Sequence, residues 1–270
     1  MKTINSISGG KSSAYIAANY KADINAFCLV RTDDPKLLWQ RGKDEKTRQL
    51  VSDKLGVEFI GTLEQDEIIY TILDLEQYLG SEIIWLTGKS FDQIIKKGKE
   101  GVFLPSKEGF RFCTTEMKIL PIYRYLRKNK IGIVESRIGF RADEEKRINS
   151  KNLTLIDGLD LYRGKPYCKP SYPLFEDGIY KKDVTAFWAD KNIRFAERNN
   201  CVGCFHRSIP FLNMMAKKEP EKMEWFANKE IGVSARWKKG TTYRKIIDFK
   251  FTLEMSFDDF SECDYGGCGL

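Results

Sequence analysis

Long apolar runs are missing from this sequence of 270 residues. No segment reaches the roughly 18 consecutive apolar residues of a membrane-spanning helix, and the N-terminal residues lack the apolar core of a signal peptide. We therefore expect a cytoplasmic protein without a membrane partner. Internal repeats and low-complexity tracts are also absent. Histidine is nearly absent, and we expect a surface role for its single occurrence, His206.

Cysteine and positive charge, by contrast, are plentiful. The chain has 7 cysteines and a formal net charge of +7. Without a secretory signal, cysteines favour metal or redox chemistry over a disulfide framework. A basic chain suits an anionic ligand, and a nucleic-acid partner is compatible with it. The lysines are spread along the chain, which is equally typical of a solvated surface.

Apolar runs alternate with amphipathic segments, which predicts a parallel sheet with crossover helices. We expect an α/β fold of three layers, built on a Rossmann-like sheet of about five mostly parallel strands. The predicted strands are Thr3–Ser8, Ile24–Arg31, Val57–Gly61, Ile83–Thr87 and Ile131–Gly139. The predicted helices between them are Lys11–Tyr20, Lys43–Leu55, Asp66–Tyr78 and Thr114–Lys128.

The composition changes after Arg147, where the sheet-forming part is predicted to end. Residues 149–173 are rich in glycine and proline, and they precede predicted helices at Lys181–Lys191 and Ile209–Lys229, the second interrupted by Pro220. A basic segment at 241–250 has a β-like pattern. We therefore divide the chain into an α/β domain, residues 1–148, and a cysteine-bearing, α-rich extension, residues 149–270. One compact domain is the alternative.

The most informative segment is the phosphate loop, residues 6–13 (SISGGKSS), which joins the first predicted strand to the first predicted helix. Glycines allow backbone N–H groups to approach phosphates, and a helix N-terminus favours negative charge. The spacing differs from that of a Walker loop. The residues predicted to bind phosphate are Ser8, Gly9, Gly10, Lys11, Ser12 and Ser13. A simple turn is the alternative.

Three cysteines are candidate metal ligands. Cys201 and Cys204 form a Cys-x-x-Cys pair, which zinc, iron–sulfur clusters and redox dithiols all use. Cys113 lies just before a predicted helix and close to Arg111 and Lys118, which would favour its thiolate form. A further segment, residues 139–147 (GFRADEEKR), is either a solvated cluster of charges or part of a binding site.

These segments together carry a family resemblance. The loop resembles that of the adenine nucleotide alpha-hydrolase superfamily, the PP-loop ATP pyrophosphatases, with Ser12 where aspartate is usual. Residues 113–121 (CTTEMKILP), then 139–147, then Cys-x-x-Cys resemble the phosphoadenosine-phosphosulfate (PAPS) reductase family of that superfamily. The matches occur in the family's order and cover about residues 1–205.

The resemblance implies site residues beyond the loop. Arg141 is expected near the nucleotide phosphates, and Asp33, after the second strand, near the adenine. Cys113, Cys201 and Cys204 match three of the four cysteines that hold a [4Fe–4S] cluster in some relatives, with zinc as the alternative. The C-terminal Cys268, or Cys263, is similar to the cysteine with which family reductases attack the activated sulfate.

Two enzymatic functions are compatible with this reading. The first is ATP-dependent sulfur transfer, in which an acceptor is adenylylated and then thiolated with the help of an iron–sulfur cluster. The second is reduction of PAPS or adenylyl sulfate (APS) to sulfite. A non-catalytic, zinc-stabilised protein that binds a nucleotide or nucleic acid is the third hypothesis. The expected partners are an adenine nucleotide, with a nucleic-acid acceptor, a thioredoxin-like thiol donor or a second copy of the chain as further candidates.

Overall fold

The computed structural model describes residues 1–95, 97–98, 101–106, 111–230 and 235–250. Its centre is a six-stranded sheet with the strand order β5-β2-β1-β8-β10-β9, in which only β9 runs antiparallel to its neighbour. The strands of this sheet are β1 (Thr3–Ile7), β2 (Ile24–Leu29), β5 (Ile84–Thr87), β8 (Val134–Arg137), β9 (Asp160–Tyr162) and β10 (Lys165–Ser171). Two short pairs stand apart from it: β3 (Arg31–Thr32) with β4 (Gly61–Thr62), and β6 (Lys97–Gly98) with β7 (Gly101–Val102).

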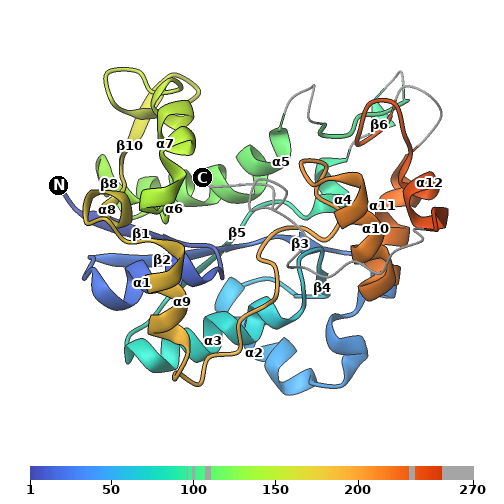
Figure 1. Ribbon diagram of the computed structural model, residues 1–270, viewed down its shortest axis with the longest axis horizontal. Helices are drawn as coiled ribbons and strands as arrows, with labels where there is room; N and C mark the ends of the chain where they lie inside the picture. Colours follow the sequence, from blue (N-terminus) through green and yellow to red (C-terminus); the bar gives the residue numbers. More distant parts are fainter. Residues whose placement is uncertain (96, 99–100, 107–110, 231–234, 251–270) are drawn as a thin grey trace.

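Helices cover both faces of the sheet (Figure 1). The helices of the first half are α1 (Lys11–Asn19), η1 (Pro35–Leu37), η2 (Trp39–Gly42), α2 (Glu45–Leu55), α3 (Glu67–Leu79), α4 (Phe91–Ile94), α5 (Phe112–Thr114), η3 (Thr115–Ile119) and α6 (Leu120–Lys128). Those of the second half are η4 (Ala142–Glu144), α7 (Glu145–Asn152), α8 (Pro173–Glu176), α9 (Lys181–Trp188), α10 (Ile209–Lys218), α11 (Pro220–Lys229) and α12 (Tyr243–Asp248). None of the helices among these residues is both long and apolar enough to span a membrane.

The alternation of side chains along each strand explains the layers. In β2, Phe27 and Leu29 point to one face and pack with α1, α2, α3 and α9. Ile24, Ala26 and Cys28 point to the other face and pack with α6. Because both faces are covered, the strands are apolar on both sides, as parallel sheets require. The predicted three-layer α/β fold is confirmed, with one strand more than expected.

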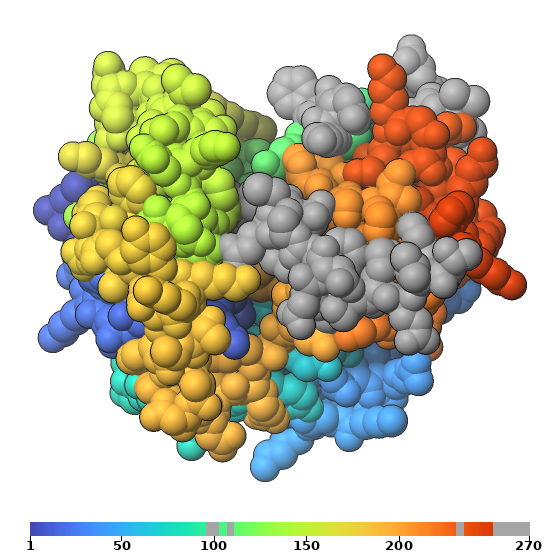
Figure 2. All heavy atoms as spheres, in the orientation of Figure 1, coloured from blue at the N-terminus to red at the C-terminus, as the bar shows by residue number. Residues whose placement is uncertain are grey.

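A third apolar cluster lies beyond the carboxyl ends of the strands. It joins α4 to α10, α11 and α12, and its aromatic members pack edge to face around Phe226. Figure 1 shows these helices at one end of the sheet, next to β3 and β4. Figure 2 shows residues of α7–α9 on the left of one face and those of α10–α12 on the right. Met214 and Met215 of α10 are buried in this cluster.

Two predictions about the sheet are wrong. The segment Val57–Gly61 is no strand of the main sheet: Phe59 is fully buried, which explains the apolar pattern, but pairing begins only at Gly61. The sheet does not end near Arg147, because β10 pairs in parallel with β8. The sequence pattern does not predict β10 as a strand because it contains two prolines, and proline cannot donate a hydrogen bond to a neighbouring strand. The division at residue 148 stays a prediction, although the sheet continues past it.

The basic segment at 241–250 is helical rather than β-like. Thr242 accepts the backbone N–H of Lys245 and so caps α12, and Tyr243 and Ile246 face the core from one side of it. The predicted helix Thr114–Lys128 is instead three pieces, with a π-helical turn in η3 before α6. Pro121 lies in the first turn of α6, where the missing N–H has no cost.

Candidate nucleotide site

The phosphate loop leaves β1 at Ile7 and enters α1 at Lys11. Gly10 is the N-cap of α1, and within the described residues no side chain accepts a hydrogen bond from the first turn of this helix. Its first N–H groups therefore remain available to an anion, and the helix dipole favours negative charge at the same point. Trp188 of α9 donates its Nε1–H to the carbonyl oxygen of Lys11, which fixes the start of the helix from outside.

The two glycines of the loop have different roles. Gly9 has a φ of +77°, and a Cβ there would lie 2.4 Å from Cγ1 of Ile68. Gly9 is therefore required by the turn and by packing against α3. Gly10 has an ordinary φ of −90°, but a Cβ there would lie 2.4 Å from Nδ2 of Asn199. The absence of a side chain at Gly10 thus leaves room beside the loop for the Asn199 amide.

Two of the loop serines shape the loop itself. The Ser8 backbone N–H donates to Oγ of Ser13 at 3.0 Å, and the Ser13 hydroxyl donates to the carbonyl oxygen of Gly10 at 3.0 Å. The Ser8 and Ser13 hydroxyls are 3.1 Å apart, and Asn199 donates to Oγ of Ser8 at 3.2 Å. These bonds hold the turn in the form that presents the N-terminus of α1.

Arg141 reaches the loop from the end of β8. Its Nη1–H donates to Oγ of Ser12 at 3.1 Å, and its Nε–H donates to Asp143 at 3.2 Å. The buried Glu144 accepts the backbone N–H of Arg141 at 3.0 Å and also pairs with the side chain of Arg147. Gly139 allows this approach, since a Cβ there would lie 3.1 Å from the Ser13 backbone nitrogen. The structure thus brings Arg141 to the phosphate loop, and its contact with nucleotide phosphates stays a prediction.

The loop opens into a cavity of about 450 Å³, within the range of about 300–1,000 Å³ that is common for small-molecule sites. Its described lining has six basic side chains and two acidic ones, Glu144 and Glu197. Such an excess of positive charge favours a polyanionic ligand. The basic residues are Lys11, Lys118, Arg141, Arg147, Lys181 and Arg198.

Small side chains of the sheet form the floor of the cavity. Ser6, Ala26 and Cys28 line it, whereas the larger Ile4 and Ile24 fill the same face nearer the amino ends of the strands. Cys28 is buried in the core, and its thiol donates to the carbonyl oxygen of Lys118 at 3.4 Å. Burial raises the pKa of Cys28 to about 12, so this thiol stays protonated and is a poor nucleophile at neutral pH.

Asp33 is not among the described residues that line this cavity. Its carboxylate accepts hydrogen bonds from Arg31 at 3.1 Å and from Ser90 at 2.5 Å. Its backbone N–H donates to Asp92 at 2.9 Å. These bonds tie the end of β2 to α4. A contact between Asp33 and adenine stays a prediction that the cavity does not support.

The residues 201–204 form a tight turn, the cysteine turn, in which the Cys204 N–H donates to the carbonyl oxygen of Cys201 at 3.1 Å. Gly203 packs on the ring of Phe226, where a Cβ would approach to 2.4 Å. The Tyr243 hydroxyl donates to the carbonyl oxygen of Gly203 at 3.0 Å. Burial, followed by the charge of Cys204, raises the pKa of Tyr243 well above its ordinary value, so this phenol remains a donor.

Cys113 and Cys201 pack against the C-terminal apolar cluster, and Cys204 is buried. Among the described residues, however, no three histidine, cysteine, aspartate or glutamate side chains gather closely enough to hold a metal ion. The described residues therefore do not by themselves form a complete iron–sulfur or zinc site. Cys263 and Cys268 lie outside the described residues. The roles predicted for these five cysteines stay predictions.

The cavity and the cysteine turn are neighbours in the chain. Asn199 and Asn200 line the cavity, and Cys201 follows directly. Successive Cα atoms are about 3.8 Å apart, so the Cys201 backbone lies close to the lining, although Cys201 is not among the described residues that line the cavity. Sequence analysis missed Asn199, Asn200, Lys181 and Arg198. The asparagine pair beside the cysteines was the only available signal.

Comparison with known proteins gave no match: no family model, no curated protein and no solved structure is similar to this chain at a significant level.

Proposed function

We propose that this cavity binds an adenine nucleotide with its phosphates on the phosphate loop, and that the protein uses ATP to activate an acceptor for sulfur transfer. One observation carries the proposal. The uncapped N-terminus of α1 and the Arg141 guanidinium meet at Ser12, in a cavity with six basic side chains and two acidic ones. This arrangement suits a polyphosphate better than a neutral ligand.

The proposed reaction has two steps. An acceptor oxygen attacks the α-phosphorus of ATP, the bond from that phosphorus to the bridging oxygen breaks, and pyrophosphate leaves with the electron pair. The N–H groups of α1, together with Lys11 and Arg141, would stabilise the charge on pyrophosphate. A sulfide sulfur then attacks the adenylylated carbon of the acceptor, the bond from that carbon to oxygen breaks, and AMP leaves with the electron pair. This order follows from the resemblance of the loop to the ATP-cleaving branch of its superfamily.

Sulfur chemistry has a separate basis. It rests on the resemblance of residues 113–121 and of the cysteine turn to the PAPS reductase family, and on the position of Cys201 next to the cavity wall. The alternative, reduction of PAPS or APS, would use the same cavity with a C-terminal cysteine as nucleophile. The two functions differ in their nucleotide and product, so direct assays separate them.

Calorimetric titration with ATP tests the binding. We expect Arg141→Ala to weaken ATP binding about 10- to 100-fold, because a hydrogen bond to a charged group contributes about 1.5–3 kcal/mol. The ATP affinity of Arg141→Lys should lie between those of the parent and Arg141→Ala proteins. The matched control is Arg124→Ala, on the exposed side of α6, which should bind ATP like the parent protein. Equal ATP affinity in the parent and Arg141→Ala proteins would contradict the proposed site.

Product assays test the reaction. Incubation with ATP and a pool of cellular RNA or duplex DNA should release pyrophosphate, whereas PAPS should release no sulfite. Sulfite from PAPS without pyrophosphate from ATP would support the reductase alternative. Tightly bound zinc without either product would support the non-catalytic one.

A further inference from the structure

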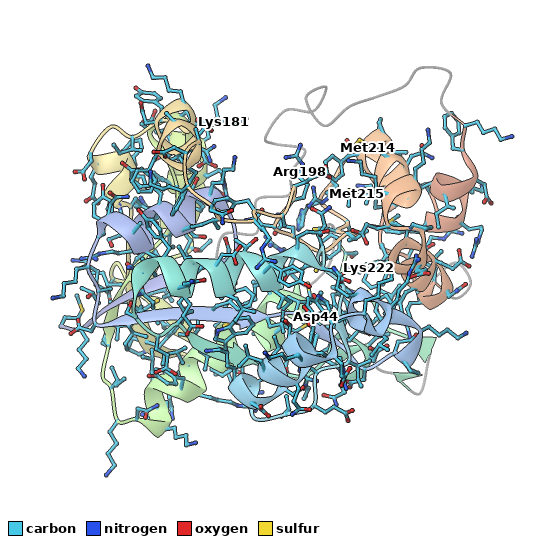
Figure 3. The ribbon with its side chains drawn as sticks, turned by 90° about the horizontal axis from the view of Figure 1, so that it is seen from below. Asp44, Lys181, Arg198, Met214, Met215 and Lys222 are labelled. Carbon is cyan, nitrogen blue, oxygen red and sulfur yellow. The ribbon has the colours of Figure 1, made fainter. Side chains whose placement is uncertain are left out.

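Residues 193–200 connect α9 to the cysteine turn and run along α3 before they reach the phosphate loop. Figure 3 labels Arg198 on this segment, between α3 and the helix that carries Met214 and Met215. Arg194 pairs with Asp74 of α3 through both Nε, at 2.8 Å, and Nη2, at 2.6 Å. Thr71 of α3 accepts the backbone N–H of Ala196 at 3.1 Å. The segment is therefore held firmly on α3 over its first half.

Two further bonds fix the chain on either side of Asn199. The Arg198 backbone N–H donates to Oε1 of Gln65 at 2.6 Å, and the Val202 N–H donates to the carbonyl oxygen of Leu63 at 2.8 Å. Both acceptors belong to the short stretch that precedes α3. Residues 199–201 therefore form an arch between two fixed points. A displacement of Asn199 has to be taken up within these three residues, and Cys201 is one of them.

The tip of this arch touches the phosphate loop. Asn199 donates one amide hydrogen to Oγ of Ser8 at 3.2 Å, and its Nδ2 stands over Gly10. A primary amide carries two N–H donors, so a phosphate oxygen above Gly10 can accept the second. Asn199 then gains a ligand contact at the point where the first N–H groups of α1 bind the same anion.

We propose that Asn199 is a positioning residue that couples occupancy of the phosphate loop to the conformation of the cysteine turn. An anion on the loop accepts a hydrogen bond from the Asn199 amide, so the Asn199 side chain moves toward the anion. Because both ends of residues 199–201 are fixed, this movement changes the conformation of Cys201. The inference rests on the proposed phosphate site but not on the nature of the reaction. It predicts that the sulfur-bearing turn is more ordered when the loop holds its anion.

Hydrogen–deuterium exchange of the full chain, with pyrophosphate as the probe, tests this coupling. The reporter is the N–H group of Cys204, which donates a hydrogen bond to Cys201 within the turn. In the parent protein, saturating pyrophosphate should slow exchange in peptides that cover residues 201–204 by roughly threefold or more, a change typical of local opening equilibria. Peptides that cover β9 and β10 serve as an internal reference.

The decisive variant is Asn199→Ala. We expect it to bind pyrophosphate roughly five- to tenfold more weakly, and at saturation to show the same exchange in residues 201–204 as the ligand-free variant. Asn199→Ser, whose hydroxyl can still donate to Ser8, should retain part of the protection. The matched control is Asn129→Ala, which removes an amide donor bonded only locally to Tyr125 on the far end of α6 and should behave like the parent.

The outcomes are distinct. Pyrophosphate-induced protection that persists in Asn199→Ala would overturn the coupling. So would binding of pyrophosphate to the parent protein without protection of residues 201–204, which leaves the phosphate site itself intact. Failure of the parent to bind pyrophosphate by calorimetry would remove the phosphate site and the coupling together.

Discussion

In the C-terminal helical cluster Lys222 and Lys238 reach backbone carbonyls, and Lys222 also pairs with Asp66, whereas around the phosphate loop basic side chains line an open cavity. Lys238 donates to the carbonyl oxygens of Phe205 and Arg207, and Lys222 to that of Glu64. Figure 3 shows Lys222 on the side of the helix pair that faces the rest of the protein. Near the loop, by contrast, Arg141 and Arg147 are steered by Glu144 into the cavity lining.

This difference predicts which substitutions affect the stability of the protein and which affect ligand binding. Internal partners in the helical cluster satisfy polar groups that would otherwise be costly to bury. The cavity instead gathers six basic side chains, and although carboxylates such as Asp143 and Glu144 pair with some of them, the excess of positive charge favours an anionic ligand. Changes in the cluster should therefore lower the free energy of unfolding, and changes at the loop should lower nucleotide affinity. Four predictions test this division, from the largest expected effect to the smallest.

The largest effect is expected for Phe226→Ala. The Phe226 ring is buried against Gly203, Trp237 and Tyr243, so its loss should lower the free energy of unfolding by about 3–5 kcal/mol. Urea unfolding measures this change. Leu153→Ala, at a residue that is 88% exposed, should stay within about 0.5 kcal/mol. An unchanged unfolding midpoint for Phe226→Ala would remove the structural role of the cluster.

Substitution of the two loop glycines should have different effects, one on stability and the other on ATP binding. Gly9→Ala places a side chain at a φ of +77° and against Ile68, so it should cost about 1–3 kcal/mol of stability. Gly10→Ala has no such backbone strain, but its methyl group meets Asn199, so it should mainly weaken ATP binding, by roughly tenfold. Thermal unfolding and calorimetry on both variants measure this contrast. Similar stability losses in the two would contradict it.

Ser12→Asp tests the role of charge at the loop. The new carboxylate would lie beside Arg141, which now donates to Oγ of Ser12 at 3.1 Å. An ion pair there would neutralise Arg141 and repel phosphate, so ATP binding should weaken about three- to tenfold with stability nearly unchanged. Ser12→Asn is the matched, uncharged control. Tighter ATP binding by Ser12→Asp would show that the loop lacks a carboxylate it needs.

The smallest effect is expected from pH. Burial raises the pKa of both Cys28 and Cys168 to about 12, while a thiol in the unfolded chain has a pKa of about 8.5. Their contribution to stability is therefore complete below about pH 8.5 and falls as pH rises toward 12, by about 1 kcal/mol per thiol at pH 9.5. Urea unfolding at pH 7.5 and 9.5 should show a smaller decline in Cys28→Ala and in Cys168→Ala. An equal decline would mean that these thiols ionise in the folded protein.

Local patterns in the sequence were sufficient to predict the central strands and helices of the fold. The predicted strands that enclose β1, β2, β5 and β8, and helices α1, α2 and α3, were found because each carries its own apolar periodicity and ends in a glycine or a cap. The loop was singled out because glycines and serines at a strand–helix junction can form an anion site, and Arg141 was singled out by the family resemblance of residues 139–147. The strand β10 was missed, since two prolines disguise it and only its neighbours β8 and β9 make it a strand.

The sequence by itself thus determined an α/β sheet with a phosphate loop at its first strand–helix junction and a Cys-x-x-Cys turn near residue 200. It could not decide which glycine supports the turn and which keeps the cavity open, because that depends on Ile68 and Asn199. It also could not place Asn199 over the loop. Such contacts join residues far apart in the chain, and only the packing of α3, α9 and the segment after it brings them together.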